Sequence, residues 1–172
     1  MKVGIIGGGR VGSRLAACLH EAGVLAGITA ASERHSAQLA QQFGVPVTDN
    51  VELWQATDVL LLTVPDRLIG TVAEELAQSV TPAAKVVLHV SGSVGLEPLA
   101  PLTQLGAHVG SLHPLQSFAG GNTQLAGVYM ALDGDSEAQD AGKKLVELFG
   151  GKALSVPAEE RAAYHAAACI CS

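Results

Sequence analysis

The stretch from Met1 to Gly12, MKVGIIGGGRVG, predicts the fold of this chain. A short apolar run, Val3 to Ile6, ends at three consecutive glycines, and an amphipathic helix pattern follows. Three glycines have G-x-G-x-x-G spacing between a strand and a helix, which is the context of a dinucleotide-binding turn. The first permits a tight turn, the second lets the backbone approach a pyrophosphate, and the third lets the helix pack on the strand. The residues predicted to hold the pyrophosphate are Gly7, Gly9, Arg10, Val11 and Gly12. The alternative is a glycine turn that only packs tightly.

Strands alternate with helices along the rest of the chain. The runs at 59–64 and 85–90 are almost wholly apolar, which is typical of parallel strands covered on both faces. Further strands are expected at 24–31, 45–47, 107–112, 128–132 and 153–156. Helices are expected at 36–43, 68–78, 96–105 and 137–149. A brief helix with Asn50 or Asp49 as its cap is expected to end at residue 54. This alternation predicts an α/β fold of the Rossmann type, a doubly wound and mostly parallel sheet with helices on both faces.

Composition excludes several classes of partner. The 172 residues are 48% hydrophobic and 15% charged, and the net charge of −6 includes no basic stripe. Nucleic acid and membrane are therefore not expected as partners. No apolar run reaches the roughly 18 residues of a membrane span. The three cysteines are an odd number, which favours reduced thiols in a cytoplasmic protein. No metal site is predicted, because Cys169 and Cys171 lack a second ligand pair.

The end of the second strand determines the choice of cofactor. An Asp or Glu about 20 residues beyond the glycines binds the ribose 2′-OH of NAD, whereas a nearby Arg accommodates the 2′-phosphate of NADP. The chain has Ser32, Glu33, Arg34 and His35 there. Ser32 and Arg34 are predicted to bind a 2′-phosphate, so NADP is favoured. Glu33 favours the 2′-OH of NAD, and NAD remains possible. The alternative for Arg34 and His35 is a solvated helix start.

Ligands of an open α/β sheet bind beyond the carboxyl ends of its strands. Val64 and Pro65 are predicted to lie against the nicotinamide half of the cofactor. Ser91 and Ser93 are predicted to donate hydrogen bonds to a substrate carboxylate or carbonyl. His113 is the candidate general acid/base, because its reference pKa lies near neutrality. The alternative for His113 is that it only fixes its loop.

The end of the chain predicts a second structural unit. Pro157 suits the first turn of a helix, and the run from Ala162 to Cys171 is apolar and prone to form one. The sequence ends there without a cap. We therefore expect a Rossmann domain at 1–156 and, at 157–172, the first helix of a helical domain that is otherwise missing from the chain.

Five stretches together resemble a known family of bacterial proteins. They are GIIGGGRVG, LLTVPD, LHVSGS, GSLHPLQSF and AAYHAAACICS. They are similar to proteins with a Rossmann-like domain followed by a DUF2520 domain, in the 6-phosphogluconate dehydrogenase-like superfamily with pyrroline-5-carboxylate reductase and F420-dependent NADP oxidoreductase. The resemblance implies an NAD(P)-dependent oxidoreductase fold followed by a helical domain that forms a dimer and closes the active site. The His113-Pro114 step also looks like that of prephenate dehydrogenases, where the histidine acts on the substrate hydroxyl.

The leading hypothesis is a cytoplasmic NADP-dependent oxidoreductase. It would transfer a hydride between nicotinamide and a small carbonyl or imine substrate, as a homodimer formed through the missing helical domain. The alternative is a non-catalytic NAD(P)-binding sensor or regulatory module, because fold alone does not decide function. An S-adenosylmethionine site fits less well, because the glycine turn suits a pyrophosphate.

Overall fold

The computed structural model describes residues 1–118, 123–156, 160, 163–164 and 166. Its centre is one sheet of seven strands, in the order β2-β1-β3-β4-β5-β6-β7. The strands are β1 (Val3–Ile6), β2 (Leu25–Thr29), β3 (Val59–Leu62), β4 (Val86–His89), β5 (His108–Pro114), β6 (Tyr129–Gly134) and β7 (Lys152–Ser155). The α-helices are α1 (Arg10–Glu21), α2 (Glu33–Phe43), α3 (Asn50–Ala56), α4 (Ile69–Ser79), α5 (Ala100–Thr103) and α6 (Ser136–Leu148).

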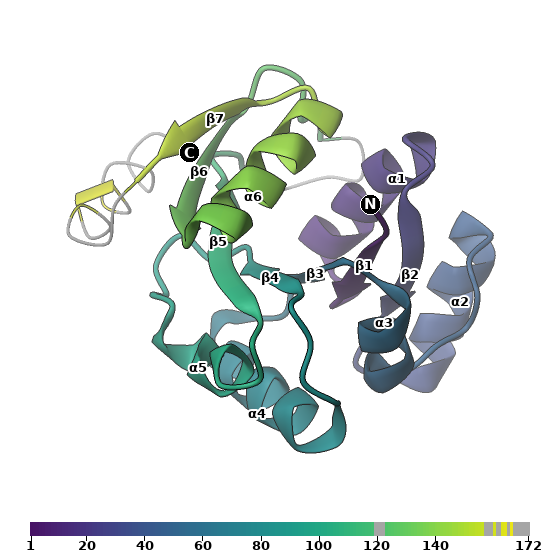
Figure 1. Ribbon diagram of the computed structural model, residues 1–172. Coiled ribbons are helices and arrows are strands. Elements are labelled where there is room, and N and C mark those ends of the chain that lie inside the picture. The colour runs from purple at the N-terminus through teal and green to yellow at the C-terminus, as the bar shows by residue number, and fades with distance from the viewer. Residues whose placement is uncertain (119–122, 157–159, 161–162, 165, 167–172) are drawn as a thin grey trace.

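Helices cover both faces of the sheet (Figure 1). Helices α1, α2 and α6 share one apolar cluster with the strand residues that point to their face, among them Ile5 and Leu61. Helices α3, α4 and α5 share a second cluster on the other face, which includes Ile6 and Leu62. Successive side chains of a strand point to opposite faces, so strands β1 and β3 contribute to both clusters. The predicted α/β class and layering are confirmed.

The strand order reverses beside β1. The chain passes from β1 outward to β2 and then returns to place β3 on the other side of β1, and β1 is parallel to both neighbours. Helix α1 therefore leaves the end of β1 on one face, while α4 follows β3 on the opposite face. Ligands of open α/β sheets bind in the crevice at such a reversal.

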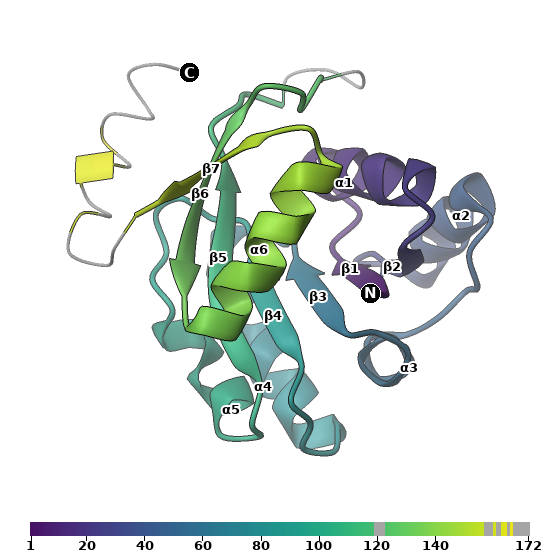
Figure 2. The same ribbon diagram turned by 45° about the horizontal axis from the view of Figure 1, so that its top comes forward.

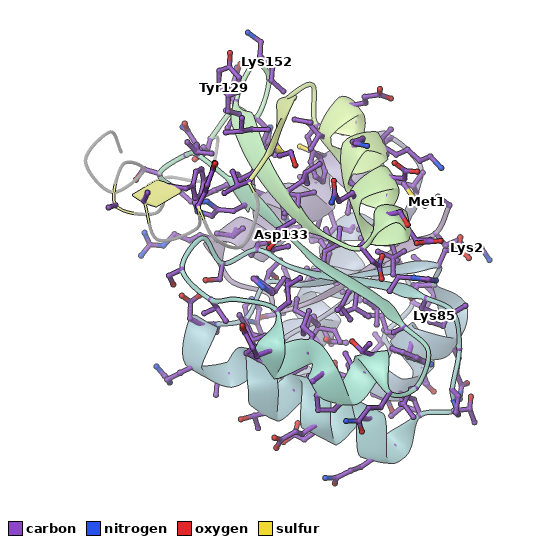
Figure 3. All side chains as sticks on the ribbon, turned by 60° about the vertical axis from the view of Figure 1, so that its left-hand side comes forward. Met1, Lys2, Lys85, Tyr129, Asp133 and Lys152 are labelled. Atoms are coloured by element: carbon purple, nitrogen blue, oxygen red, sulfur yellow. The ribbon has the colours of Figure 1, made fainter. Side chains whose placement is uncertain are left out.

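The far edge of the sheet departs from the parallel pattern. Strand β6 runs antiparallel to β5, and β7 is parallel to β6 (Figure 2). At this edge the Lys152 ammonium lies 5.3 Å from the centre of the Tyr129 ring (Figure 3). The sheet is therefore mostly parallel, as predicted, with an antiparallel step confined to the side away from the strand reversal.

Several elements differ from the predictions, and three of these differences have a local physical reason. No strand forms at 45–47, where Pro46 lacks an amide to donate and Val47 is 66% exposed. Helix α2 begins three residues early, because the Ser32 hydroxyl caps it by accepting a hydrogen bond from the His35 amide at 3.3 Å. Strand β5 extends to Pro114, because it pairs with both β4 and β6.

The predicted helix at 162–171 lies mostly outside the described residues. The residues of this range that the structure describes are 163, 164 and 166, and they are helical. Of the helices that the structure describes, none combines the length and hydropathy that crossing a bilayer requires.

Cys18 is expected to be a poorly reactive thiol. It is buried within α1, and this burial raises its thiol pKa above the ordinary value, an effect that nearby Arg14 opposes. Since the thiolate is the nucleophile, iodoacetamide should label Cys18 in the native protein much more slowly than in urea. Peptide mapping by mass spectrometry separates Cys18 from the other cysteines. Equal native and denatured rates would show that α1 opens readily.

Candidate functional site

In the glycine turn after β1, a side chain at Gly7 or Gly12 would collide with backbone atoms. Gly7 has a φ of +121°, and a Cβ there would lie 2.7 Å from the backbone carbon of Thr63. A Cβ on Gly12 would lie 1.9 Å from the carbonyl oxygen of Gly7. Gly7 therefore makes the tight turn and Gly12 the close packing of α1, in agreement with the roles inferred from their spacing.

Thr63 holds this turn in place. Its hydroxyl lies 2.6 Å from the Gly7 carbonyl oxygen, to which it donates, and 3.3 Å from that of Ile6. Ser13, in the first turn of α1, donates to the Gly8 carbonyl oxygen at 3.2 Å. Sequence reasoning did not find Thr63, which it placed within an apolar strand; the only signal was a hydroxyl at the end of a buried run.

Gly9 is the open position of the turn. Its φ is −72°, it is exposed, and a Cβ there would meet no atom within 4 Å. It is also the N-cap of α1, and no side chain caps the helix. The first amides of a helix are attractive to anions, particularly when no side chain satisfies them. The turn thus offers both the space and the donors that a pyrophosphate needs.

A cleft of about 880 Å³ opens at this turn. One wall consists of the glycine turn and the start of α1. The opposite wall includes Leu68, the residue before α4, and Val72, which belongs to α4. The predicted site residues that line the cleft are Gly7, Gly9, Arg10, Val11, Val64, Pro65 and Ser91. The structure brings them together from the ends of three strands. Gly12 lies beneath the turn, and Ser32, Arg34, Ser93 and His113 are not part of the lining.

A second cavity of about 750 Å³ continues from the cleft toward α2 and α3. The two share lining residues, among them Thr29, Ala30 and Asn50. The Asn50 side-chain oxygen accepts a hydrogen bond from the Thr29 hydroxyl at 2.6 Å. Glu33 lines this cavity. From its sequence context, Asn50 was predicted only as a possible helix cap. Asp49 fills that role, and the position of Asn50 in the cavity lining was not predicted.

Hydrogen bonds join the ends of β3 and β4. The Ser93 hydroxyl donates to the Asp66 carboxylate at 2.8 Å. The Ser91 oxygen accepts from the backbone amides of Ser93 and Val94, at 3.2 and 3.1 Å. The Ser91 and Ser93 hydroxyl oxygens are 3.3 Å apart. Asp66 and Ser91 line the cleft, so this network forms part of its wall.

His113 lies near the end of β5, against the loop that follows β4. Its Nδ1 is 2.7 Å from the Tyr164 hydroxyl, and the two rings meet edge to face with centres 5.7 Å apart. A Cβ on Gly92 would lie 2.5 Å from His113 Cε1, so the ring occupies the space that a side chain at position 92 would need. The expected acid/base residue is therefore beside the cleft, behind Gly92, and half-buried.

Family comparisons agree with this geometry. The Rossmann-like domain family matches residues 1–114, and the chain belongs to it. A domain of unknown function, DUF2520, matches residues 128–172. A comparison with curated proteins finds no significant match to the sequence.

Solved structures share the fold. Protein TM1727 from Thermotoga maritima is 26% identical with a TM-score of 0.77, over 99% of this chain and 63% of that one. An arogenate dehydrogenase from Synechocystis is 22% identical with a TM-score of 0.78, over 94% of this chain and 61% of that one. Psf3, in a complex with NADP+ and 2-OPP, is 20% identical with a TM-score of 0.72, over 91% of this chain and 57% of that one. The chain thus spans about three fifths of the length of these proteins.

Proposed function

We propose that this Rossmann-like protein is an NADP-dependent oxidoreductase that transfers a hydride between nicotinamide and a small carbonyl or imine substrate. The observation that carries the proposal is the open glycine turn. An uncapped helix start and an empty Cβ position at Gly9 face a cleft at the strand reversal, where a dinucleotide pyrophosphate would fit. The proposal is supported by the occurrence of this fold in an arogenate dehydrogenase from Synechocystis and in Psf3, whose structure contains NADP+.

The cleft suggests how a cofactor would lie. The pyrophosphate would meet the glycine turn together with Arg10 and Val11. The adenosine half would extend over the end of β2 into the cavity that Asn50 lines, and the nicotinamide would lie toward Val64 and Pro65. When bound, the nicotinamide supplies or accepts the hydride. The protein's own contribution is to hold the cofactor and to place the substrate beside the end of β4.

Three residues are proposed for the substrate side. Ser91 lines the cleft, and Ser93 donates a hydrogen bond to Asp66, which also lines it. His113 packs against Gly92, which follows Ser91. For a carbonyl substrate His113 would be the general acid/base, acting from the end of β5. Because the chain spans only part of the length of its structural relatives, turnover should be measured on the full-length protein.

NADP is proposed over NAD because Arg34 lies in the first turn of α2, exposed beside the adenosine cavity. The Ser32 hydroxyl caps α2, so Arg34 would carry most of the recognition of a 2′-phosphate. Glu33 lines the cavity itself and is the residue that would favour the 2′-OH of NAD.

A fluorescence titration of NADPH and NADH into the full-length protein tests the proposal. NADPH should bind more tightly than NADH, and Arg34→Ala should weaken NADPH roughly tenfold or more while leaving NADH unchanged, as expected for loss of one charge-assisted contact. Lys143→Ala, which removes an exposed positive charge from α6, is the matched control and should change neither affinity. If neither nucleotide binds, the proposed function is wrong. If both bind equally and Arg34→Ala has no effect, the cofactor choice is wrong.

A further inference from the structure

Asp66 is the ionisable side chain among the described lining residues that directly follow β3 and β4. These residues are Thr63, Val64, Pro65, Asp66, Val90 and Ser91, and Phe118 from the segment after β5 lies with them in the lining. The described lining has a second carboxylate, Glu75 of α4, which also lines the cavity that extends toward α2 and α3. The Asp66 carboxylate therefore sets the charge that a substrate would meet beside the nicotinamide.

The hydrogen bonds at this end determine which groups can donate. Ser93 gives its only hydroxyl proton to Asp66, at 2.8 Å. Where the two serine hydroxyls interact, at 3.3 Å, Ser91 must therefore be the donor and Ser93 the acceptor. The Ser91 oxygen also accepts from two backbone amides. Both hydroxyl protons thus point along a chain that ends at the Asp66 carboxylate. This end of the cleft offers an anionic acceptor rather than donors for a substrate oxygen.

The positive groups of the described lining come from the helices. Arg10 begins α1 at the glycine turn, where the pyrophosphate is proposed, and its guanidinium is engaged by the Phe118 carbonyl oxygen, to which it donates at 3.4 Å. His35 belongs to α2, on the adenosine side. Asp66 is therefore the charged group that the described lining fixes at the ends of β3 and β4, whereas Arg10 and His35 belong to α1 and α2.

Resting on the proposed function, we infer that the substrate is a small iminium cation and that Asp66 binds its N–H group. Hydride adds to the iminium carbon, and the π electron pair of the C=N bond moves to the nitrogen. The imine is reduced to a neutral amine and the nicotinamide is oxidised. Charge and atoms balance without a proton donor in this step. A carbonyl substrate would instead develop an alkoxide beside the Asp66 carboxylate, which the like charge would disfavour.

This inference also accounts for the place of His113. An iminium is protonated before the hydride arrives, so the cleft needs no acid at the reacting nitrogen. His113 lies behind Gly92 rather than in the cleft lining. Ser93 is then a positioning residue, because its hydrogen bond holds the Asp66 carboxylate against the β4 end.

The test is a binding experiment on full-length protein saturated with NADPH, whose nicotinamide is neutral and which reduces neither probe. Cyclopentylamine and cyclopentanecarboxylate are probes of the same ring size and opposite charge, and their affinities are measured by NMR titration at low salt. The wild type should bind the ammonium at least about tenfold more tightly than the carboxylate, as expected for a hydrogen bond to a charged group. Asp66→Asn should remove this preference. Glu74→Gln neutralises an exposed carboxylate of α4 outside the cleft lining and should preserve it.

The outcomes separate the two proposals. If NADPH binds and the carboxylate binds as well as the ammonium, the iminium inference is wrong and the oxidoreductase proposal stands. Unchanged ammonium affinity in Asp66→Asn would overturn the inference in the same way. If NADPH does not bind at all, the proposed function fails, and the inference that rests on it fails with it.

Discussion

Gly12→Ala should lower the free energy of unfolding by about 3 kcal/mol or more and abolish cofactor binding. A methyl group at position 12 would lie 1.9 Å from the Gly7 carbonyl oxygen and 2.5 Å from the Thr63 hydroxyl oxygen. The first of these is backbone and cannot turn away. Helix α1 would have to move off the turn, opening a tightly packed region that includes Leu15 and Leu19, which have no exposed surface. Urea denaturation followed by circular dichroism gives the stability, and NADPH fluorescence gives the binding.

Gly9→Ala is the matched control for that result. Position 9 has a φ of −72° and no neighbour within 4 Å of an added Cβ, so the fold should tolerate alanine with a change of about 0.5 kcal/mol or less. The new methyl group would extend into the cleft where the pyrophosphate is proposed, so NADPH affinity should fall roughly tenfold or more while stability is kept. Normal NADPH binding by Gly9→Ala would mean that the phosphates lie elsewhere.

The glycine turn was predictable because its requirements are local. A strand, a turn that needs a positive φ at Gly7 and a helix start follow one another within the first 12 residues. The apolar pair Val45 and Val47 gave a false strand for the opposite reason. Whether a short extended segment joins a sheet depends on a partner strand. The residues around Val45 and Val47 do not show that this segment has no partner strand. Strand β5 was predicted two residues short because its pairing with β6 was not considered.

The side chains of the site were harder to predict than its position. The strand ends were recognised, but the sequence does not show that Ser32 caps a helix or that Ser93 gives its proton to Asp66. The latter contact joins residues 27 positions apart and depends on the register of β3 against β4, in which Leu62 faces His89. The contact between His113 and Tyr164 spans 51 positions and was missed for the same reason.

Gly92→Ala should lower the free energy of unfolding by about 1–3 kcal/mol and displace His113. The added Cβ would lie 2.5 Å from His113 Cε1 and 2.7 Å from its Nδ1. These atoms are part of one rigid ring, so rotating the side chain must carry Nδ1 away from the Tyr164 hydroxyl, now 2.7 Å distant. Urea denaturation measures the loss of stability. Histidine ring ¹⁵N NMR shows whether Nδ1 keeps its hydrogen bond.

Gly70→Ala provides the comparison for this substitution. It lies within α4, and its added Cβ would be 3.7 Å from a Pro98 carbon, an ordinary contact. Alanine there should raise stability by about 0.5–1 kcal/mol, because glycine is a poor helix former. A Gly92→Ala protein as stable as Gly70→Ala, with the His113 ring signals unchanged, would mean that the ring has room to spare. The opposite result would show that His113 packs against the end of β4 because Gly92 has no side chain. Gly92 is next to Ser91, the serine that lines the cleft.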